Sequence, residues 1–108
     1  MKQFALLAVA LLMGTTCVAQ TRNLPKPNLQ RQTLSVMETF QQRKSVRDYS
    51  TKKLSEQDLS DLLWASMGVN RDNGNLTAPT AMNRQEIRLY VFDDKGVSQY
   101  DPKTHSLT

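Results

Sequence analysis

The stretch SEQDLSDLLWASMG, residues 55–68, carries the strongest fold signal in the chain. Ser55 and Asp58 have the spacing of a helix-capping pair, and Gly68 stands where a left-handed residue commonly closes a helix. The pattern predicts a helix whose apolar face contains residues at helical spacing, namely Leu59, Leu62, Leu63 and Met67, widened by Trp64 and Ala65. We expect this helix to lie deep in a core, because a helix of this length is marginal without tertiary packing.

Downstream of this helix the sequence predicts a run of short strands. Residues 87–92 alternate in polarity, and 93–96 supply a turn of the type that joins two antiparallel strands. Residues 97–100 then predict a second strand, 101–104 a second turn, and 105–108 the beginning of a third strand. We therefore expect an α+β fold in which helices pack on an antiparallel sheet.

Upstream of residues 55–68 the sequence predicts another helix. Ser35 followed by Glu38 has the spacing of a reciprocal capping box, and the helix should run to about Lys44. Val36, Met37 and Phe40 give it an apolar side. Residues 20–34 contain Pro25 and Pro27 among polar residues and predict an extended linker, so that the domain proper covers residues 35–108.

The first nineteen residues have the pattern of a secretory signal peptide. Lys2 precedes an apolar run from Phe4 to Met13 that is too short to cross a bilayer, and small residues follow up to Ala19. We expect cleavage after Ala19 and export to the periplasm or the cell exterior. An uncleaved membrane anchor and a lipid anchor on Cys17 are the alternatives that the pattern leaves open.

Composition limits the chain to one small domain and excludes some partners. The 108 residues carry 14 Lys and Arg against 10 Asp and Glu, so the net charge of +4 is mild. Basic residues are scattered among acidic ones except in residues 43–53, a distribution that does not favour nucleic-acid binding. Cys17 is the single cysteine and lies in the expected signal peptide, so the sequence offers no disulfide framework.

Arg43, Ser45 and Arg47 stand at every second position and form the most specific candidate site. In an extended backbone such residues point to one side, where two guanidinium groups and a hydroxyl could bind one anion such as a phosphate. A solvated basic patch after a helix is the alternative interpretation.

Residues 70–83 form a long polar loop around Pro79, and loops of this length are commonly functional or disordered. No cluster with metal-ligand spacing is visible, so no metal site is expected. His105 is the single histidine, lies at the end of a predicted turn and is expected at the surface. Hydrolysis by a protein nucleophile is not favoured, because no serine or cysteine set can be assembled with a base.

Three motifs occur in register, namely RKSVR at 43–47, LLWASMGVNR at 62–71 and APTAMNRQ at 78–85. Together they resemble the N-terminal half of nitroreductase-family FMN-dependent oxidoreductases, near the azoline-oxidising dehydrogenase relatives. The resemblance covers about residues 35–107. It implies a nitroreductase-like fold of which the chain supplies the N-terminal portion only.

The resemblance also implies roles for residues. The family's Arg-x-Ser-x-Arg/Lys segment binds the FMN phosphate, and it falls on the three residues Arg43, Ser45 and Arg47. A second family segment reaches the flavin from the partner subunit of a homodimer, and it falls on Pro79, Thr80, Ala81 and Asn83. Ala81 replaces a family serine, so that any contact there would come from the backbone. A capped turn leading into the next strand is the alternative interpretation of residues 79–83.

The implied function is two-electron redox chemistry between a donor and a small-molecule electron acceptor. The flavin carries this chemistry, so no catalytic residue is expected in this half of the fold. Two alternatives remain open at this point. One is a secreted, non-catalytic module that binds another anion through the same arginines, and the other is a truncated, inactive fragment.

Overall fold

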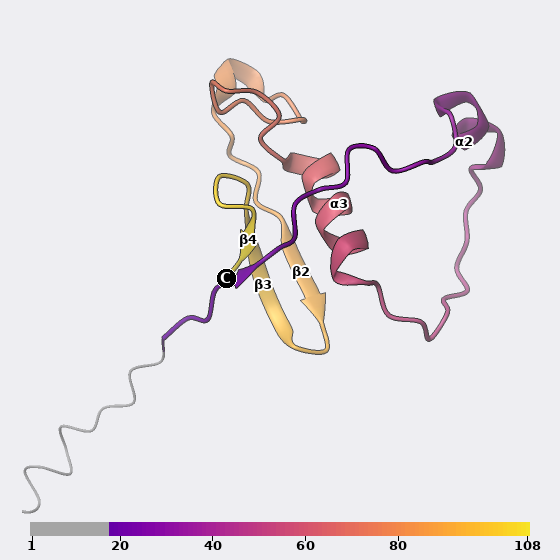
Figure 1. The fold of residues 1–108 in the computed structure, drawn as a ribbon, viewed down its shortest axis with the longest axis horizontal. Coiled ribbons are helices and arrows are strands. Elements are labelled where there is room, and N and C mark those ends of the chain that lie inside the picture. The colour runs from indigo at the N-terminus through magenta and orange to yellow at the C-terminus, as the bar shows by residue number, and fades with distance from the viewer. Residues whose placement is uncertain (1–17) are drawn as a thin grey trace, which may run out of the picture.

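The computed structural model describes residues 18–108 and contains a four-stranded antiparallel sheet with the order β1-β4-β3-β2. The strands are β1 (Arg22–Asn23), β2 (Tyr90–Asp93), β3 (Gly96–Asp101) and β4 (Ser106–Leu107). Helix α3 (Glu56–Met67) lies along the sheet, whereas α2 (Val36–Gln42) lies beyond α3 on a long excursion of the chain (Figure 1). The expected α+β class and antiparallel sheet are confirmed.

Helix α3 provides one side of the core and begins as predicted. The Oγ of Ser55 accepts a hydrogen bond of 3.0 Å from the backbone N–H of Asp58. The helix buries Ser60, Leu63 and Met67. The core cluster contains side chains from the helix, the sheet and two loops, namely Leu24, Leu63, Met67, Leu76, Tyr100 and Leu107.

The face that α3 buries differs in part from the predicted one. Leu62 is 55% exposed, Ala65 is exposed and Trp64 is only partly buried. Ser60 takes the place of Leu62 against the sheet, because residues 60, 63 and 67 follow one line along the helix. The expectation that this helix lies deep in a core is therefore wrong, since it is buried along one side.

Gly68 ends α3 as predicted, but for a different physical reason. Its φ of −70° and ψ of 154° are extended, so the expected left-handed conformation is wrong. A Cβ at this position would lie 2.6 Å from Cγ of the Trp64 indole ring and 2.6 Å from the Trp64 carbonyl oxygen. Glycine is required here because the Trp64 side chain covers the backbone.

The β2–β3 hairpin forms where it was predicted, but β2 begins at Tyr90, three residues after the expected start of the strand at residue 87. Asp93 pairs with Gly96, and Gly96 adopts a φ of 119° that glycine tolerates readily. Phe92 lies directly opposite Val97, so these two side chains share one face of the sheet. That face is solvent-exposed at both residues, while Val91 packs against the core from the other face.

Helix α2 forms with the predicted capping box but buries nothing. The backbone N–H of Ser35 donates to Oε2 of Glu38 at 2.8 Å, and the N–H of Glu38 donates to Oγ of Ser35 at 3.2 Å. Every residue of the helix is exposed, including Val36, Met37 and Phe40. The helix ends at Gln42, two residues before the expected boundary.

Residues 22–31 are part of the domain, so the linker interpretation of residues 20–34 is wrong for this portion. Strand β1 pairs with β4, and Leu24 is buried in the core. The backbone N–H of Asn28 then donates to Oδ1 of Asp61 at 2.8 Å, and Arg31 forms ion pairs with Asp58 and Asp61. This segment is thereby attached along α3.

The polar loop after α3 contains some structure of its own. Val69 and Leu76 form an isolated antiparallel bridge, and Leu76 is buried in the core. A short 3-10 helix, η1, covers Ala81–Asn83. Residues 1–17 of the expected signal peptide, Cys17 included, lie outside the described residues. The roles of the signal peptide and of Cys17 stay predictions. Within residues 18–108, no helix has the length and apolar character needed to cross a membrane.

Candidate functional site

The segment that contains Arg43, Ser45 and Arg47 follows α2 directly and forms neither helix nor strand. Arg43 closes the helix, with its N–H donating to the Thr39 carbonyl at 3.0 Å, and its φ of −61° and ψ of 124° are extended. The expected extended backbone is therefore present at the first of the three positions. All three residues are solvent-exposed.

The side chains of Arg43, Ser45 and Arg47 are available to a ligand. Among residues 18–108, the hydrogen bonds and ion pairs of the structure engage none of these three side chains. Lys53, at the far end of the same basic segment, is instead paired with Asp94. Two guanidinium groups and a hydroxyl are therefore presented within five positions without protein acceptors, which suits an anionic ligand.

The second predicted group, residues 79–83, lies in a turn with unusual backbone geometry. Met82, Asn83 and Gln85 adopt φ values of 53°, 51° and 51°, all in the left-handed region that non-glycine residues rarely occupy. Such conformations persist where the surrounding structure holds them, and they concentrate at ligand sites. Pro79 and Ala81 are exposed within this turn, and the Ala81 carbonyl accepts a hydrogen bond from Arg84 N–H at 3.3 Å.

Hydrogen bonds fix the polar side chains of this turn. The Thr80 hydroxyl accepts from the Gln85 backbone N–H at 2.9 Å, which leaves its own proton for another acceptor. The Asn83 side chain donates to Oδ1 of Asn75 at 3.1 Å, and its Oδ1 accepts from Nε2 of Gln85 at 3.1 Å. The amide of Asn83 is thus oriented before any ligand arrives.

One chain does not bring the two groups together. The arginine segment follows α2 and lies with it to one side of α3, whereas η1 lies beyond the C-terminal end of α3 (Figure 1). Hydrogen bonds hold the turn that contains Thr80 and Asn83, whereas the side chains of Arg43, Ser45 and Arg47 have no such bonds within residues 18–108. The role of the seven residues in holding a cofactor therefore stays a prediction.

The structure contains a polar network that the sequence did not reveal, and His105 is its centre. Tyr100 OH lies 2.8 Å from Nδ1 of His105, and Nε2 lies 2.7 Å from Oγ of Ser60. Ser60 donates in turn to the Pro25 carbonyl at 2.5 Å. The expectation that His105 is a surface residue is wrong, since its ring is half-buried between α3 and the sheet.

This network serves the fold and does not form a nucleophile site. Ser60 has no exposed surface, and its proton is used by the Pro25 carbonyl. Burial, followed by the nearby charge of Asp101, raises the pKa of Tyr100 to about 12, so the phenol stays protonated beside Nδ1 of His105. The only sequence signal was a serine at a position with core spacing, which is too weak to identify the partners.

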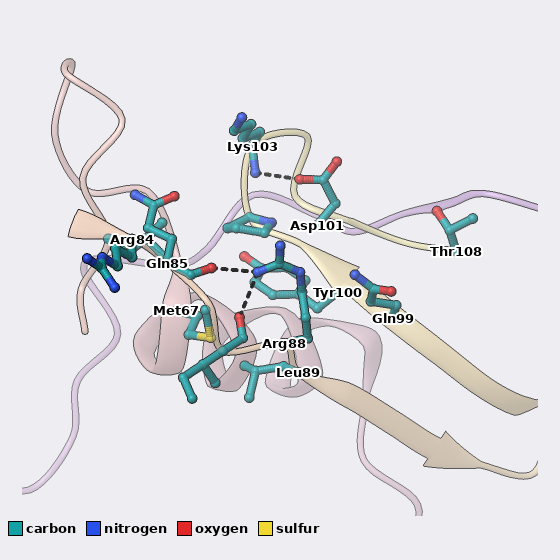
Figure 2. A pocket seen from close by; sticks show the side chains of 13 residues that line it. Met67, Arg84, Gln85, Arg88, Leu89, Gln99, Tyr100, Asp101, Lys103 and Thr108 are labelled. Carbon is teal, nitrogen blue, oxygen red and sulfur yellow. Dashed lines mark hydrogen bonds between the residues drawn. The ribbon is translucent and has the colours of Figure 1, made fainter. Parts of the chain in front are cut away.

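A cavity of about 560 Å³ opens between the η1–β2 segment and the β3–β4 turn. Figure 2 shows the Arg88 guanidinium group near the middle of the view, with Arg84 to its left and Lys103 above it. The cavity's apolar lining includes three core side chains, Met67, Leu76 and Tyr100, and the partly buried Leu89. We call this hollow the basic cavity. No sequence motif indicates this cavity, because Lys103 comes from a turn that is distant in sequence from Arg84 and Arg88. Among the described residues no group of three metal-ligating side chains occurs.

Comparison with known proteins gives a consistent assignment. Residues 40–108 match the model of the Nitroreductase family. A curated nitroreductase homologue from Methanocaldococcus jannaschii is 27% identical over 96 residues, which cover 83% of this chain and 48% of that protein. A nitroreductase crystal structure from Ralstonia eutropha JMP134 is similar with a TM-score of 0.76 and 36% identity.

The alignment with the Ralstonia structure covers 88% of this chain and 44% of the solved one. The chain therefore spans less than half the length of either relative. The family match extends over most of the chain and includes both predicted segments, and the fold agrees with it. The protein belongs to the nitroreductase family and corresponds to part of its fold.

Proposed function

We propose that the protein acts as an FMN-dependent oxidoreductase of the nitroreductase type, with a homodimeric active form and a small-molecule electron acceptor. Membership of the nitroreductase family supports an oxidoreductase of this type. The observation that carries the cofactor proposal is the exposed, unpaired set Arg43, Ser45 and Arg47.

The chemistry of this donor set fits the phosphate end of FMN. A guanidinium group presents paired N–H donors that match two phosphate oxygens, and the Ser45 hydroxyl adds a donor between the two arginines. Neither arginine has to leave a carboxylate in the described structure before it binds, so ligand binding breaks no ion pair. In our proposal, Arg43 and Arg47 balance the phosphate charge, and Ser45 orients it.

The turn at residues 79–83 would supply the polar contacts to the rest of the cofactor. Asn83 is held in place by Asn75 and Gln85, and Thr80 retains a free hydroxyl proton. Because this turn lies apart from Arg43 and Arg47 within one chain, we propose that a second copy brings it to the cofactor. The family segment at Pro79, Thr80, Ala81 and Asn83 supports this arrangement.

FMN, when bound, accepts and delivers two electrons as its own chemistry. The residues of this chain bind and orient it. Arginine charge near the phosphate fixes one end of the cofactor, and a preorganised amide such as that of Asn83 limits its motion at the other. No proton transfer is assigned to a side chain of this chain.

A comparison of FMN with riboflavin tests the phosphate role directly. The two ligands differ in the phosphate. We expect flavin fluorescence to be quenched on binding at concentrations at least tenfold lower for FMN than for riboflavin. A tenfold difference in affinity corresponds to about 1.4 kcal/mol of binding free energy. In the double variant Arg43→Ala and Arg47→Ala, the preference should fall to about twofold or less. Fluorescence titration of the full chain gives both affinities.

Lys44→Ala provides the matched control, because it removes one charge from the same segment at the intervening position. We expect it to keep most of the preference for FMN. Equal affinity for both flavins in the unaltered chain, or a preference that survives loss of both arginines, would refute the assignment. Stabilisation by inorganic phosphate without any flavin binding would favour a non-catalytic anion-binding module.

We also propose that the protein is exported, because residues 1–19 have the pattern of a signal peptide. Mass spectrometry of the protein recovered from a periplasmic extract should give an N-terminus at Gln20. Recovery only as a cytoplasmic protein that retains Lys2 would contradict export. A lipid on Cys17 would appear as an added acyl mass on a chain beginning there.

A further inference from the structure

We propose that the basic cavity binds a small amphipathic carboxylate, a ligand that joins one anionic group to an aromatic or hydrocarbon body. The proposal stands independently of the flavin proposal, because the cavity contains neither Arg43 nor Arg47. Its volume of about 560 Å³ lies within the range typical of small-molecule sites.

The side chains that line the cavity carry an excess of positive charge. Arg84, Arg88 and Lys103 line the cavity, and Asp101 is its single acidic residue. Oδ1 of Asp101 accepts the backbone N–H of Lys103 at 2.9 Å. None of the three cations takes part in an ion pair within residues 18–108, although Arg22, Arg31, Lys53 and Lys95 all do. An excess of positive charge around one hollow favours an anion.

Hydrogen bonds to the backbone hold the Arg88 side chain in place before a ligand binds. Nη1 of Arg88 donates to the Gln85 carbonyl at 2.5 Å and to the Ile87 carbonyl at 3.2 Å. Figure 2 shows how these two bonds hold the guanidinium group across the middle of the cavity. Its other nitrogens, Nε and Nη2, have no described partner. A planar group fixed in this way presents donors to a planar carboxylate with less loss of side-chain entropy on binding.

The apolar side chains of the cavity favour an amphipathic anion over an inorganic one. Met67, Leu76, Leu89 and Tyr100 form the inner wall, and the Tyr100 hydroxyl is directed to His105. A phosphate ion on this wall would lose water without gaining hydrogen bonds from it. An aromatic ring would instead remove its own apolar surface from water, together with the exposed part of Leu89.

Isothermal titration of the full chain with four probes tests the proposal without flavin. Benzoate has the charge and the ring, benzamide is its neutral analogue, acetate lacks the ring, and inorganic phosphate lacks any apolar body. We expect benzoate to bind about tenfold or more tightly than the other three, because charge and apolar burial each contribute on that scale. Equal binding of benzoate and benzamide, or tighter binding of phosphate, would overturn the proposal.

Substitution then places the ligand. In the double variant Arg84→Gln and Lys103→Gln, both altered side chains are exposed, so the fold should persist while benzoate affinity falls about tenfold. The double variant Lys44→Gln and Lys52→Gln removes the same charge outside the cavity and should bind benzoate within twofold of the unaltered chain. An equal loss in both double variants would indicate a general charge effect and refute the site.

Arg88→Lys separates the fixed guanidinium group from its charge. We expect benzoate to bind more weakly while acetate changes little, since lysine keeps the charge but loses the fork held by the Gln85 and Ile87 carbonyls. If Arg88→Lys fails to fold, the exposed pair Arg84 and Lys103 still decides the proposal. Unchanged benzoate binding in a folded Arg88→Lys variant would contradict the role of this arginine.

Discussion

The two helices of this chain begin alike and end in opposite environments. In both, a serine hydroxyl accepts the N–H of the residue three positions later, at Ser35 in α2 and at Ser55 in α3. Helix α3 buries three residues against the sheet, whereas α2 exposes Val36, Met37 and Phe40 at 67%, 75% and 69%. Local sequence is sufficient to start a helix, but burial requires a second surface at the right place.

The largest difference in stability is expected between substitutions at two adjacent leucines of α3. Leu63 is 6% exposed and belongs to the core, while Leu62 is 55% exposed. We expect Leu63→Ala to lower the free energy of unfolding by about 2–5 kcal/mol, because it removes buried methyl groups and leaves a cavity. Leu62→Ala should change it by about 0.5 kcal/mol or less. Urea denaturation measures both, and equal losses would contradict the placement of the buried face.

A somewhat smaller effect is expected at Gly68, where the polypeptide leaves α3. A methyl group there would meet the Trp64 ring and carbonyl, so Gly68→Ala should cost about 1–3 kcal/mol through forced repacking. At Gly74, where φ is 80° and the space around the added atom is open, the cost would arise from backbone strain alone. In Gly68→Ala the Trp64 fluorescence should also change, which Gly74→Ala should not produce. Unaltered fluorescence and stability in Gly68→Ala would refute the steric reason.

The sequence predicted the elements whose signals are local. Both caps, the β2–β3 turn and the end of α3 at Gly68 depend on residues a few positions apart, so composition and spacing were sufficient. The choice between Ser60 and Leu62 was not local. Both lie near the apolar stripe, and only the position of the sheet decides which one is buried.

The contacts of residues 22–24 with residues 105–107 could not be predicted from the sequence either, because they too are not local. Arg22 pairs with Leu107, and the Leu24 N–H donates to the His105 carbonyl at 3.2 Å. Nothing in the short, proline-flanked segment around these first residues indicates a strand partner more than eighty positions away. A two-residue strand has too few side chains to show alternation.

The two caps provide the third test of the comparison between α2 and α3. Ser55→Ala should lower the free energy of unfolding by about 1 kcal/mol, since a cap on a packed helix stabilises the whole fold. Ser35→Ala removes an equivalent cap, yet it should leave the urea midpoint unchanged because α2 buries no residue. Its effect should be a local loss of helicity over Val36–Gln42, seen in amide chemical shifts. A lowered urea midpoint in Ser35→Ala would show that α2 is coupled to the core.

The chemistry of the candidate site stays a prediction from the sequence, and its geometry did not follow from the sequence. Alternation of Arg43, Ser45 and Arg47 indicated an anion site, and the structure leaves their side chains accessible. The left-handed backbone at Met82 and Asn83 carries no glycine signal, because hydrogen bonds from Gln85 hold the turn. The basic cavity depends on the meeting of two turns that are separated in sequence. Such a meeting follows from the sheet register rather than from a motif.

The smallest effect should come from acid titration of the carboxylates attached to each helix. In α3, the hydrogen bond from Arg31 and then that from Ser55 hold the pKa of Asp58 below its ordinary value of 3.8. The Asn28 N–H and then Gln57 do the same for the pKa of Asp61. In α2, the Ser35 backbone N–H lowers the pKa of Glu38 from 4.5.

A carboxyl group whose pKa is lower in the folded state stabilises the fold above the pKa of the unfolded state, and this contribution disappears as pH falls through the folded-state value. For Asp58 and Asp61 the urea midpoint should therefore decline below about pH 3.8, and Asp61→Asn should flatten that decline. Protonation of Glu38 should instead weaken only the amide signals of α2, because that helix supports no buried contact. If Glu38→Gln shifted the acid decline as much as Asp61→Asn, the exposed helix would contribute to global stability and the contrast between α2 and α3 would not hold.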